Sequence, residues 1–323
     1  MASSSLRRIF WWVLRGAASA VLLWLVMRQL HLPTVERLFR EIRWGWLAVA
    51  FGIILINRGL SVLRFLLMLR AKGVAFDEKA VARIVLGSEF YGAFLPSSVG
   101  ADSIRLYSLM RHTGDTTESV SAVLLERALG VVALLLFGCV GALWIWGHVA
   151  DHRIIKIALI PSMVGLLAAA VLNERWLSAL IRWAGLHQHR WVAKLLEWRR
   201  AVRAYREHPQ VMAKAFVVSL GILFFRVASV YCSARALGAP IPFAYFMAFI
   251  PLILLISLLP ISIGGFGVRE NAFIACFSQV GVAPAVAFSV SILAHVLSVV
   301  GNVPGGLWSL WGTGRVMAGE SRS

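Results

Sequence analysis

The chain has 323 residues, of which 59% are hydrophobic and only 15% are charged. Soluble globular domains average about 45–50% apolar and about 25% charged residues, so this composition excludes a soluble fold and indicates an integral membrane protein with several spans. The formal net charge of +17 would suggest a nucleic-acid partner only in a soluble protein. In a membrane protein, basic loops set the topology and attract anionic headgroups, so we expect no nucleic acid.

The first half of the chain is predicted to contain three transmembrane helices and one broken half-helix. A basic start leads into an uncleaved first span, and a polar loop separates this span from the second. A shorter apolar run then stops at a proline, and a short polar helix and a third span follow. The expected spans are residues 9–27, 44–69 and 119–146, the half-span is 84–95, and the polar helix is 102–112.

The second half is predicted to repeat this order, with a basic amphipathic segment on the membrane surface after its first span. Its expected spans are residues 154–172, 210–237 and 284–311, its half-span is 246–259, its short segment is 270–280, and the surface segment is 190–208. We therefore expect one all-α polytopic membrane domain over residues 1–323. It would contain about six transmembrane helices and two broken, re-entrant half-helices, with repeats at about 1–150 and 151–323.

The two broken half-helices end in nearly the same motif. Residues 96–105 and 260–269 both read Pro-x-Ser-(Val/Ile)-Gly-(Ala/Gly)-x-x-x-Arg. Proline and glycine interrupt a helix, and broken backbone survives in a membrane only when it is buried in protein or lines a wet cavity. The alternative is a pair of ordinary loops at the membrane surface. Matched interruptions in corresponding halves favour a central transporter site.

The odd number of spans in each half predicts the topology. Three spans per half make the two copies face opposite ways, which gives an inverted repeat; one missed or extra span per half would make the repeats parallel. Placing both termini in the cytoplasm puts most of the lysine and arginine on the inner side. We expect this orientation in a bacterial inner membrane.

Several arginines lie within the apolar spans. Arg58, Arg64, Arg127 and Arg226 would each cost about 2.5–3.5 kcal/mol at the bilayer centre without a partner. The nearby carboxylates are too few to neutralise these arginines and the two motif arginines; they are Glu89, Asp102, Glu126 and Glu270. Surplus arginine around a cavity suits a phosphate, whose oxygens the guanidinium fork binds in pairs. The alternative, snorkelling to the headgroups, is strongest for Arg64 near a span end.

These patterns give a set of candidate site residues. The predicted substrate-binding residues are Arg105, Arg269, Asp102, Ser98, Ser262, Gly100, Gly264, Arg58 and Arg226. Glu126, Arg127 and Glu270 are candidates for a gate or an ion pair, and His295 is a candidate for proton coupling because an ordinary histidine titrates near neutrality. No nucleophile–base pair, metal signature or nucleotide loop is visible, so we expect no cofactor, no metal and no enzymatic activity.

The same residues resemble a known family. Asn57-Arg58, Arg64, Glu126-Arg127 and the two motif copies resemble the flippase-like transmembrane region of lysylphosphatidylglycerol synthase, the multiple peptide resistance factor. The resemblance covers essentially the whole chain and is most specific over residues 259–270. The first copy departs at Ala101, where the family pattern has glycine; alanine is small enough that we expect the same fold.

The resemblance implies a protein that moves a lipid between leaflets. We expect a translocase for an anionic phospholipid or a lipid-linked or terpenoid lipid, whose headgroup is held by arginines while its tail stays in the bilayer. No soluble aminoacyl-transfer domain is expected, so lysyl-lipid synthesis is not implied. The alternative is a non-transporting membrane partner that anchors or presents lipid to a cell-envelope glycosyltransferase.

Overall fold

The computed structural model describes residue 28 and residues 32–71, 77–94, 100–113, 116–146, 209–257 and 267–317. These residues form helices and no strand. The elements are α2 (Leu32–Arg40), α3 (Trp44–Ala71), α4 (Glu78–Phe94), α5 (Gly100–Thr113), α6 (Thr116–Ile145), α10 (Pro209–Ala236), α11 (Phe243–Ser257), α12 (Val268–Ser278) and α13 (Pro284–Met317).

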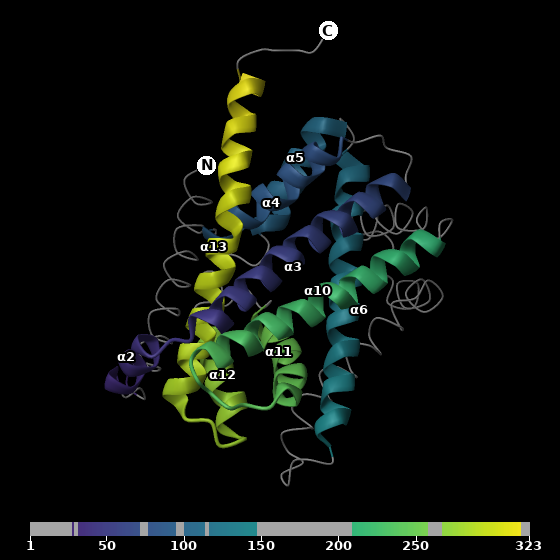
Figure 1. Cartoon of the computed structure of the whole chain (residues 1–323). Coiled ribbons are helices and arrows are strands. Elements are labelled where there is room, and N and C mark those ends of the chain that lie inside the picture. Colours follow the sequence, from purple (N-terminus) through teal and green to yellow (C-terminus); the bar gives the residue numbers. More distant parts are fainter. Residues whose placement is uncertain are drawn as a thin grey trace, which may run out of the picture.

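The four long helices α3, α6, α10 and α13 are each long and apolar enough to cross a membrane (Figure 1). They confirm helices at the predicted second, third, fifth and sixth spans. Their outward faces carry large apolar side chains such as Trp44, Trp144 and Val217, which are 73%, 63% and 65% exposed and match a lipid-facing surface. The spans predicted at 9–27 and 154–172, and the segment at 190–208, lie outside the described residues.

Short helices occur in two pairs, α4 with α5 and α11 with α12, and the members of each pair pack against each other. Each motif copy joins the two members of a pair: α5 begins at Gly100 and α12 at Val268, inside the first and second copy. Residues 95–99 and 258–266 lie outside the described residues, and with them the predicted site residues Ser98, Ser262 and Gly264.

The helices α3 and α10 run antiparallel and pack along their length (Figure 1). The backbone N–H of Arg43, just before α3, donates to the carbonyl of Ala236 at the end of α10, at 2.8 Å. Near the helix middles, Asn57 Nδ2 donates to the carbonyl of Ile222 at 2.5 Å. This places Arg58 and Arg226, one from each helix, near the centre of the bundle.

The first short helix of each half packs against the last long helix of the other half. The helix α4 packs against α13, and α11 packs against α6. Glycine makes both approaches possible: a Cβ on Gly305 of α13 would lie 2.4 Å from Leu86 Cβ, and one on Gly141 of α6 would lie 2.4 Å from the Met247 carbonyl oxygen. Small residues of this kind let helix backbones approach closely in membranes, where no hydrophobic driving force acts between them.

The segment predicted as a polar loop before α3 is instead the helix α2, so that expectation is wrong for residues 32–40. Leu32, Val35 and Phe39 recur at helical spacing, and Val35 packs against the core while Arg40 pairs with Glu36 four residues away at 2.6 Å on the exposed face. The sequence does contain this amphipathic pattern, although the many charged residues of the segment are more typical of a loop.

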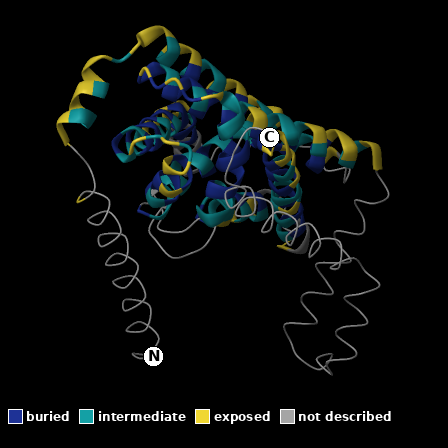
Figure 2. Cartoon of the chain, turned by 90° about the horizontal axis from the view of Figure 1, so that it is seen from below, coloured by how far each residue is buried: buried dark blue, intermediate teal, exposed yellow. Residues whose placement is uncertain are grey.

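The largest apolar core lies around the α11–α12 pair. Phe246, Phe249 and Phe277 are almost fully buried there, and Phe246 and Phe277 have ring centroids 5.0 Å apart. Burial is concentrated where the helices face one another, while exposed residues lie on the outer faces (Figure 2). The core therefore fixes the second helix pair, and α12 presents its first turn to the bundle interior.

Gly141→Ala should destabilise the protein, because the added Cβ meets the backbone of α11 rather than a flexible side chain. We expect a cost of about 1–3 kcal/mol and a lower melting temperature in detergent. Gly52→Ala on α3 is the matched control, since a Cβ there has nothing within 4 Å. Equal melting temperatures for the two variants would show that α6 and α11 do not approach as described.

Candidate functional site

A polar cavity of about 470 Å³ lies between the long helices and the two helix pairs. A smaller cavity of about 120 Å³ adjoins it, and Arg58, Arg226, Arg269 and His295 line both. The charged residues on the wall of the larger cavity are Arg58, Arg64, Glu89, Asp102, Arg105, Glu126, Arg127, Arg226 and Arg269.

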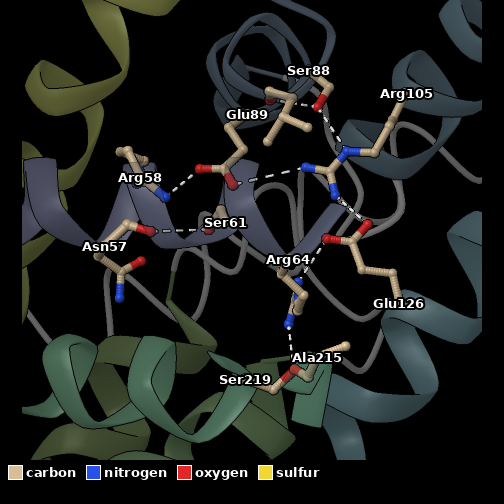
Figure 3. Close-up of polar contacts among 11 residues, drawn as sticks. Asn57, Arg58, Ser61, Arg64, Ser88, Glu89, Arg105, Glu126, Ala215 and Ser219 are labelled. Carbon is tan, nitrogen blue, oxygen red and sulfur yellow. Dashed lines mark hydrogen bonds and ion pairs between the residues drawn. The ribbon is translucent and has the colours of Figure 1, made fainter. Parts of the chain in front are cut away.

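Five of these residues form a chain of alternating charge that begins and ends on α3 (Figure 3). Arg58 bonds Glu89 of α4, and Glu89 lies 3.7 Å from Arg105 of α5. Arg105 bonds Glu126 of α6 at 2.5 Å, and Glu126 bonds Arg64 of α3 at 2.6 Å. The chain therefore ties four helices of the first half to one another.

Burial makes this network strong and costly to break. Arg105 and Glu126 are 5% and 3% exposed, and Arg105 also donates from Nε to Ser88 Oγ at 3.1 Å. Removing one partner of a buried ion pair leaves an uncompensated charge and typically costs about 3–5 kcal/mol. Arg64 also donates to Ser219 of α10 at 3.2 Å. The structure thus holds Arg64 in the interior, and the snorkelling alternative is wrong for it.

The neighbours Glu126 and Arg127 do not pair with each other. Glu126 faces Arg64 and Arg105, whereas Arg127 bonds Asp102 of α5 and keeps 30% of its side chain exposed. Adjacent residues on a helix point about 100° apart, so each reaches a different neighbouring element. Arg127 with Asp102 is consequently a separate contact between α5 and α6 on the cavity wall.

The start of α12 shows how the second motif copy positions its arginine. Gly267 precedes the helix with φ of +81°, a conformation that only glycine adopts readily. The backbone N–H of Gly267 donates to Glu270 Oε2 at 2.7 Å, which satisfies one of the unpaired donors of the first turn. Glu270 is fully buried, and its other oxygen accepts from Arg269 at 2.6 Å.

Arg269 also bonds His295 of α13, with Nη1 and Nδ1 2.7 Å apart. A guanidinium can only donate, so Nδ1 of His295 must accept. The imidazole is then neutral, with its proton on Nε2. His295 thereby holds Arg269 at the point where the two cavities adjoin.

Arg226 differs from every other arginine on this wall. Its side chain is exposed to both cavities, and no carboxylate or hydrogen-bond acceptor among the described residues contacts it. Arg58, Arg64 and Arg269 lie within electrostatic range of it, and so does the carboxylate of Glu89. A guanidinium in this setting requires an anion or water in the cavity.

The structure brings most of the predicted site residues to one cavity. Arg58, Asp102, Arg105, Glu126, Arg127, Arg226, Arg269 and His295 line it, Glu270 lies behind Arg269, and Gly100 is buried at the start of α5. Arg105, predicted to hold a headgroup, is instead engaged by two carboxylates.

Three further polar residues were missed by sequence reasoning: Ser88, Ser219 and Ser298. Arg58 donates to Ser298 at 2.8 Å. A lone serine in an apolar helix carries no signal by itself, because its hydroxyl is ordinarily satisfied by the helix backbone. One available signal was overlooked. Residues 55–62 and 223–230 both read Leu-x-x-Arg-x-x-Ser-Val, which marks Arg58 and Arg226 as equivalent residues of α3 and α10.

The departure at Ala101 from the family pattern is compensated within the same helix pair. A Cβ on Gly92, near the end of α4, would lie 2.4 Å from the Ala101 Cβ. The close approach of α4 and α5 is therefore made possible by a glycine on the facing helix.

The chain matches the family model described as the lysylphosphatidylglycerol synthase TM region over residues 12–306. The chain belongs to this family. Comparison with individual curated proteins gives no match. A lysylphosphatidylglycerol synthase TM-region protein with apolar spanning helices is an integral membrane protein connected with lipids, which confirms the resemblance inferred from the motifs.

Glu126→Gln should destabilise this family member strongly, because it removes the shared partner of Arg64 and Arg105 while keeping the shape of the side chain. We expect a loss of about 3 kcal/mol or more, seen as a lower melting temperature in detergent. Glu36→Gln is the control, since its pair with Arg40 is exposed and should contribute nothing measurable. A Glu126→Gln protein as stable as the parent would contradict the network.

Gly92→Ala should also lower the melting temperature, because the new methyl group meets Ala101. Ala101→Gly in the same chain should restore part of the loss, since it removes the facing methyl group. If the changes in melting temperature of Gly92→Ala and Ala101→Gly simply add in the double variant, the two positions are not in contact.

Proposed function

We propose that this protein is a lipid translocase that moves a lipid with an anionic headgroup between leaflets. The observation that carries the proposal is Arg226, an arginine near the middle of a spanning helix that faces a polar cavity and has no carboxylate partner among the described residues. A charge at that depth is expensive in hydrocarbon, so its presence favours a functional ligand. A scaffold would need no such charge.

The proposal includes two inverted repeats. Its support is the packing: α3 lies antiparallel to α10, and the contact of α4 with α13 has its counterpart in the contact of α11 with α6. In an inverted repeat, equivalent helices run in opposite directions and exchange equivalent contacts. The two motif copies would then approach the cavity from opposite faces, and both termini would be cytoplasmic in a bacterial inner membrane.

In this mechanism the headgroup enters the cavity and the tail remains in the bilayer. Arg226 contacts the phosphate first, and Arg58 and Arg269 contribute donors from the two sides. The chain of ion pairs on α3–α6 holds Arg58 in place. The ion pair of Arg127 with Asp102 would act as a gate, because it joins α5 to α6 and is partly exposed.

Proton coupling at His295 is part of the proposal. Protonation of Nδ1 would turn the acceptor of Arg269 into a donor and break that hydrogen bond. Arg269 would then be free to move toward or away from the headgroup. Energy would come from an ion gradient or from the lipid gradient alone.

Translocation of fluorescent lipids in reconstituted vesicles tests the function. The vesicles contain an anionic labelled phospholipid, and a quencher is added outside. Label from the inner leaflet should be quenched faster in vesicles that contain the parent protein than in protein-free vesicles. Arg226→Gln should slow this by about tenfold or more, equivalent to about 1.4 kcal/mol. Lys214→Gln is the matched control, because it removes one positive charge from an exposed position of the same helix.

Equal rates for Arg226→Gln and the parent would contradict the proposed role of Arg226. Absence of translocation by folded protein, for every labelled lipid, would favour the alternative of a partner that presents lipid to a cell-envelope glycosyltransferase.

A further inference from the structure

The charges on the cavity wall do not balance. Six arginines line the larger cavity: Arg58, Arg64, Arg105, Arg127, Arg226 and Arg269. Four carboxylates bond them: Glu89, Asp102, Glu126 and Glu270. With His295 neutral, the described wall carries two surplus positive charges.

The two surplus charges can be located. Arg127 with Asp102 and Arg269 with Glu270 are neutral pairs. The chain of Figure 3 holds three arginines and two glutamates, which leaves one charge. Arg226 carries the second. The two surpluses adjoin at Arg58, which is a member of the chain and lines both cavities together with Arg226.

The acidic residues of the sequence agree with this count of charges. Between His208 and Gly319, Glu270 is the only acidic residue, and it is already held by Arg269 and the Gly267 N–H. The motif stretches 95–99 and 258–266 contain no charged residue, so they cannot neutralise Arg226. The chain from residue 209 to residue 318 therefore supplies no further carboxylate that could pair with Arg226.

We propose that this cavity selects a lipid that ends in a phosphomonoester, whose headgroup carries two negative charges, over a phosphodiester lipid. This rests on the proposed function and specifies its substrate class. A phosphodiester carries one negative charge and would leave one positive charge of the cavity wall uncompensated, whereas a phosphomonoester would balance both. A terminal phosphate also offers three free oxygens, which suits the forks of Arg58 and Arg226 together with Arg269.

Binding of a matched pair of short-chain lipids tests the proposal. Dihexanoyl phosphatidic acid and dihexanoyl phosphatidylmethanol share their tails and differ by one methyl group on the phosphate. We would measure both dissociation constants for the purified full-length protein in an uncharged detergent at pH 8, by thermophoresis. The monoester should bind about tenfold more tightly or better.

Lowering the pH to 5 should remove most of this preference, because a phosphomonoester gains a proton with a pKa of about 6 while a diester does not. The diester at pH 5 reports any titration of the protein itself. Arg226→Gln should lose the preference at pH 8, and Lys214→Gln should keep it. Inorganic phosphate, which shares the charge and lacks the tail, should not displace the lipid at tenfold excess; displacement would assign the site to free phosphate.

Equal affinity of the two lipids at pH 8, or a preference unchanged in Arg226→Gln, would overturn the proposal. These outcomes are separate from those of the translocation assay. If both lipid types are transported equally well and the transport depends on Arg226, the translocase function is supported and the selectivity is contradicted. If the monoester binds selectively but no lipid is transported, the phosphomonoester site is supported and the translocase function is contradicted.

Discussion

The alternating ion pairs from Arg58 through Glu89, Arg105 and Glu126 to Arg64 are the constraint on which the first half of this protein depends. Both ends of the chain lie on α3, so α4, α5 and α6 are each held against that helix by a buried charge. Loss of one member leaves the largely buried charge of its neighbours uncompensated, which is costly. The network thus gives the cavity wall a fixed shape that packing of apolar side chains alone would not specify.

The second half is built differently around equivalent positions. Among its described residues, the interior relies on apolar packing of Phe246, Phe249 and Phe277, and the buried carboxylate of Glu270 accepts a hydrogen bond from the Gly267 N–H at the start of α12. Arg226 corresponds to Arg58 in the repeated Leu-x-x-Arg-x-x-Ser-Val pattern, yet only Arg58 has a glutamate opposite it. This asymmetry between otherwise similar halves leaves one arginine open to the cavity, and the proposed anion site follows from it.

Much of the fold could be predicted because a membrane imposes simple requirements on sequence. Apolar length predicted the helices α3, α6, α10 and α13, and proline and glycine predicted where α4 and α11 stop. The helix α2 was predicted as a polar loop because the segment is rich in charged residues, although its apolar residues have helical spacing. The sequence named the carboxylates near these arginines, but it did not show which of them pairs with Arg64 and which with Arg127, because each partner lies on another helix.

The sequence by itself determined that this is a membrane protein, where the four long apolar helices of the described residues lie, and that arginine outnumbers acid within them. Those properties depend on composition and local pattern, which tertiary contacts do not alter. Only the tertiary structure decided which arginine each carboxylate neutralises, that Arg105 is buried and engaged, and that Arg226 is left facing the cavity. Ion pairing is settled by distance in space, and helices from both halves must pack before those distances exist.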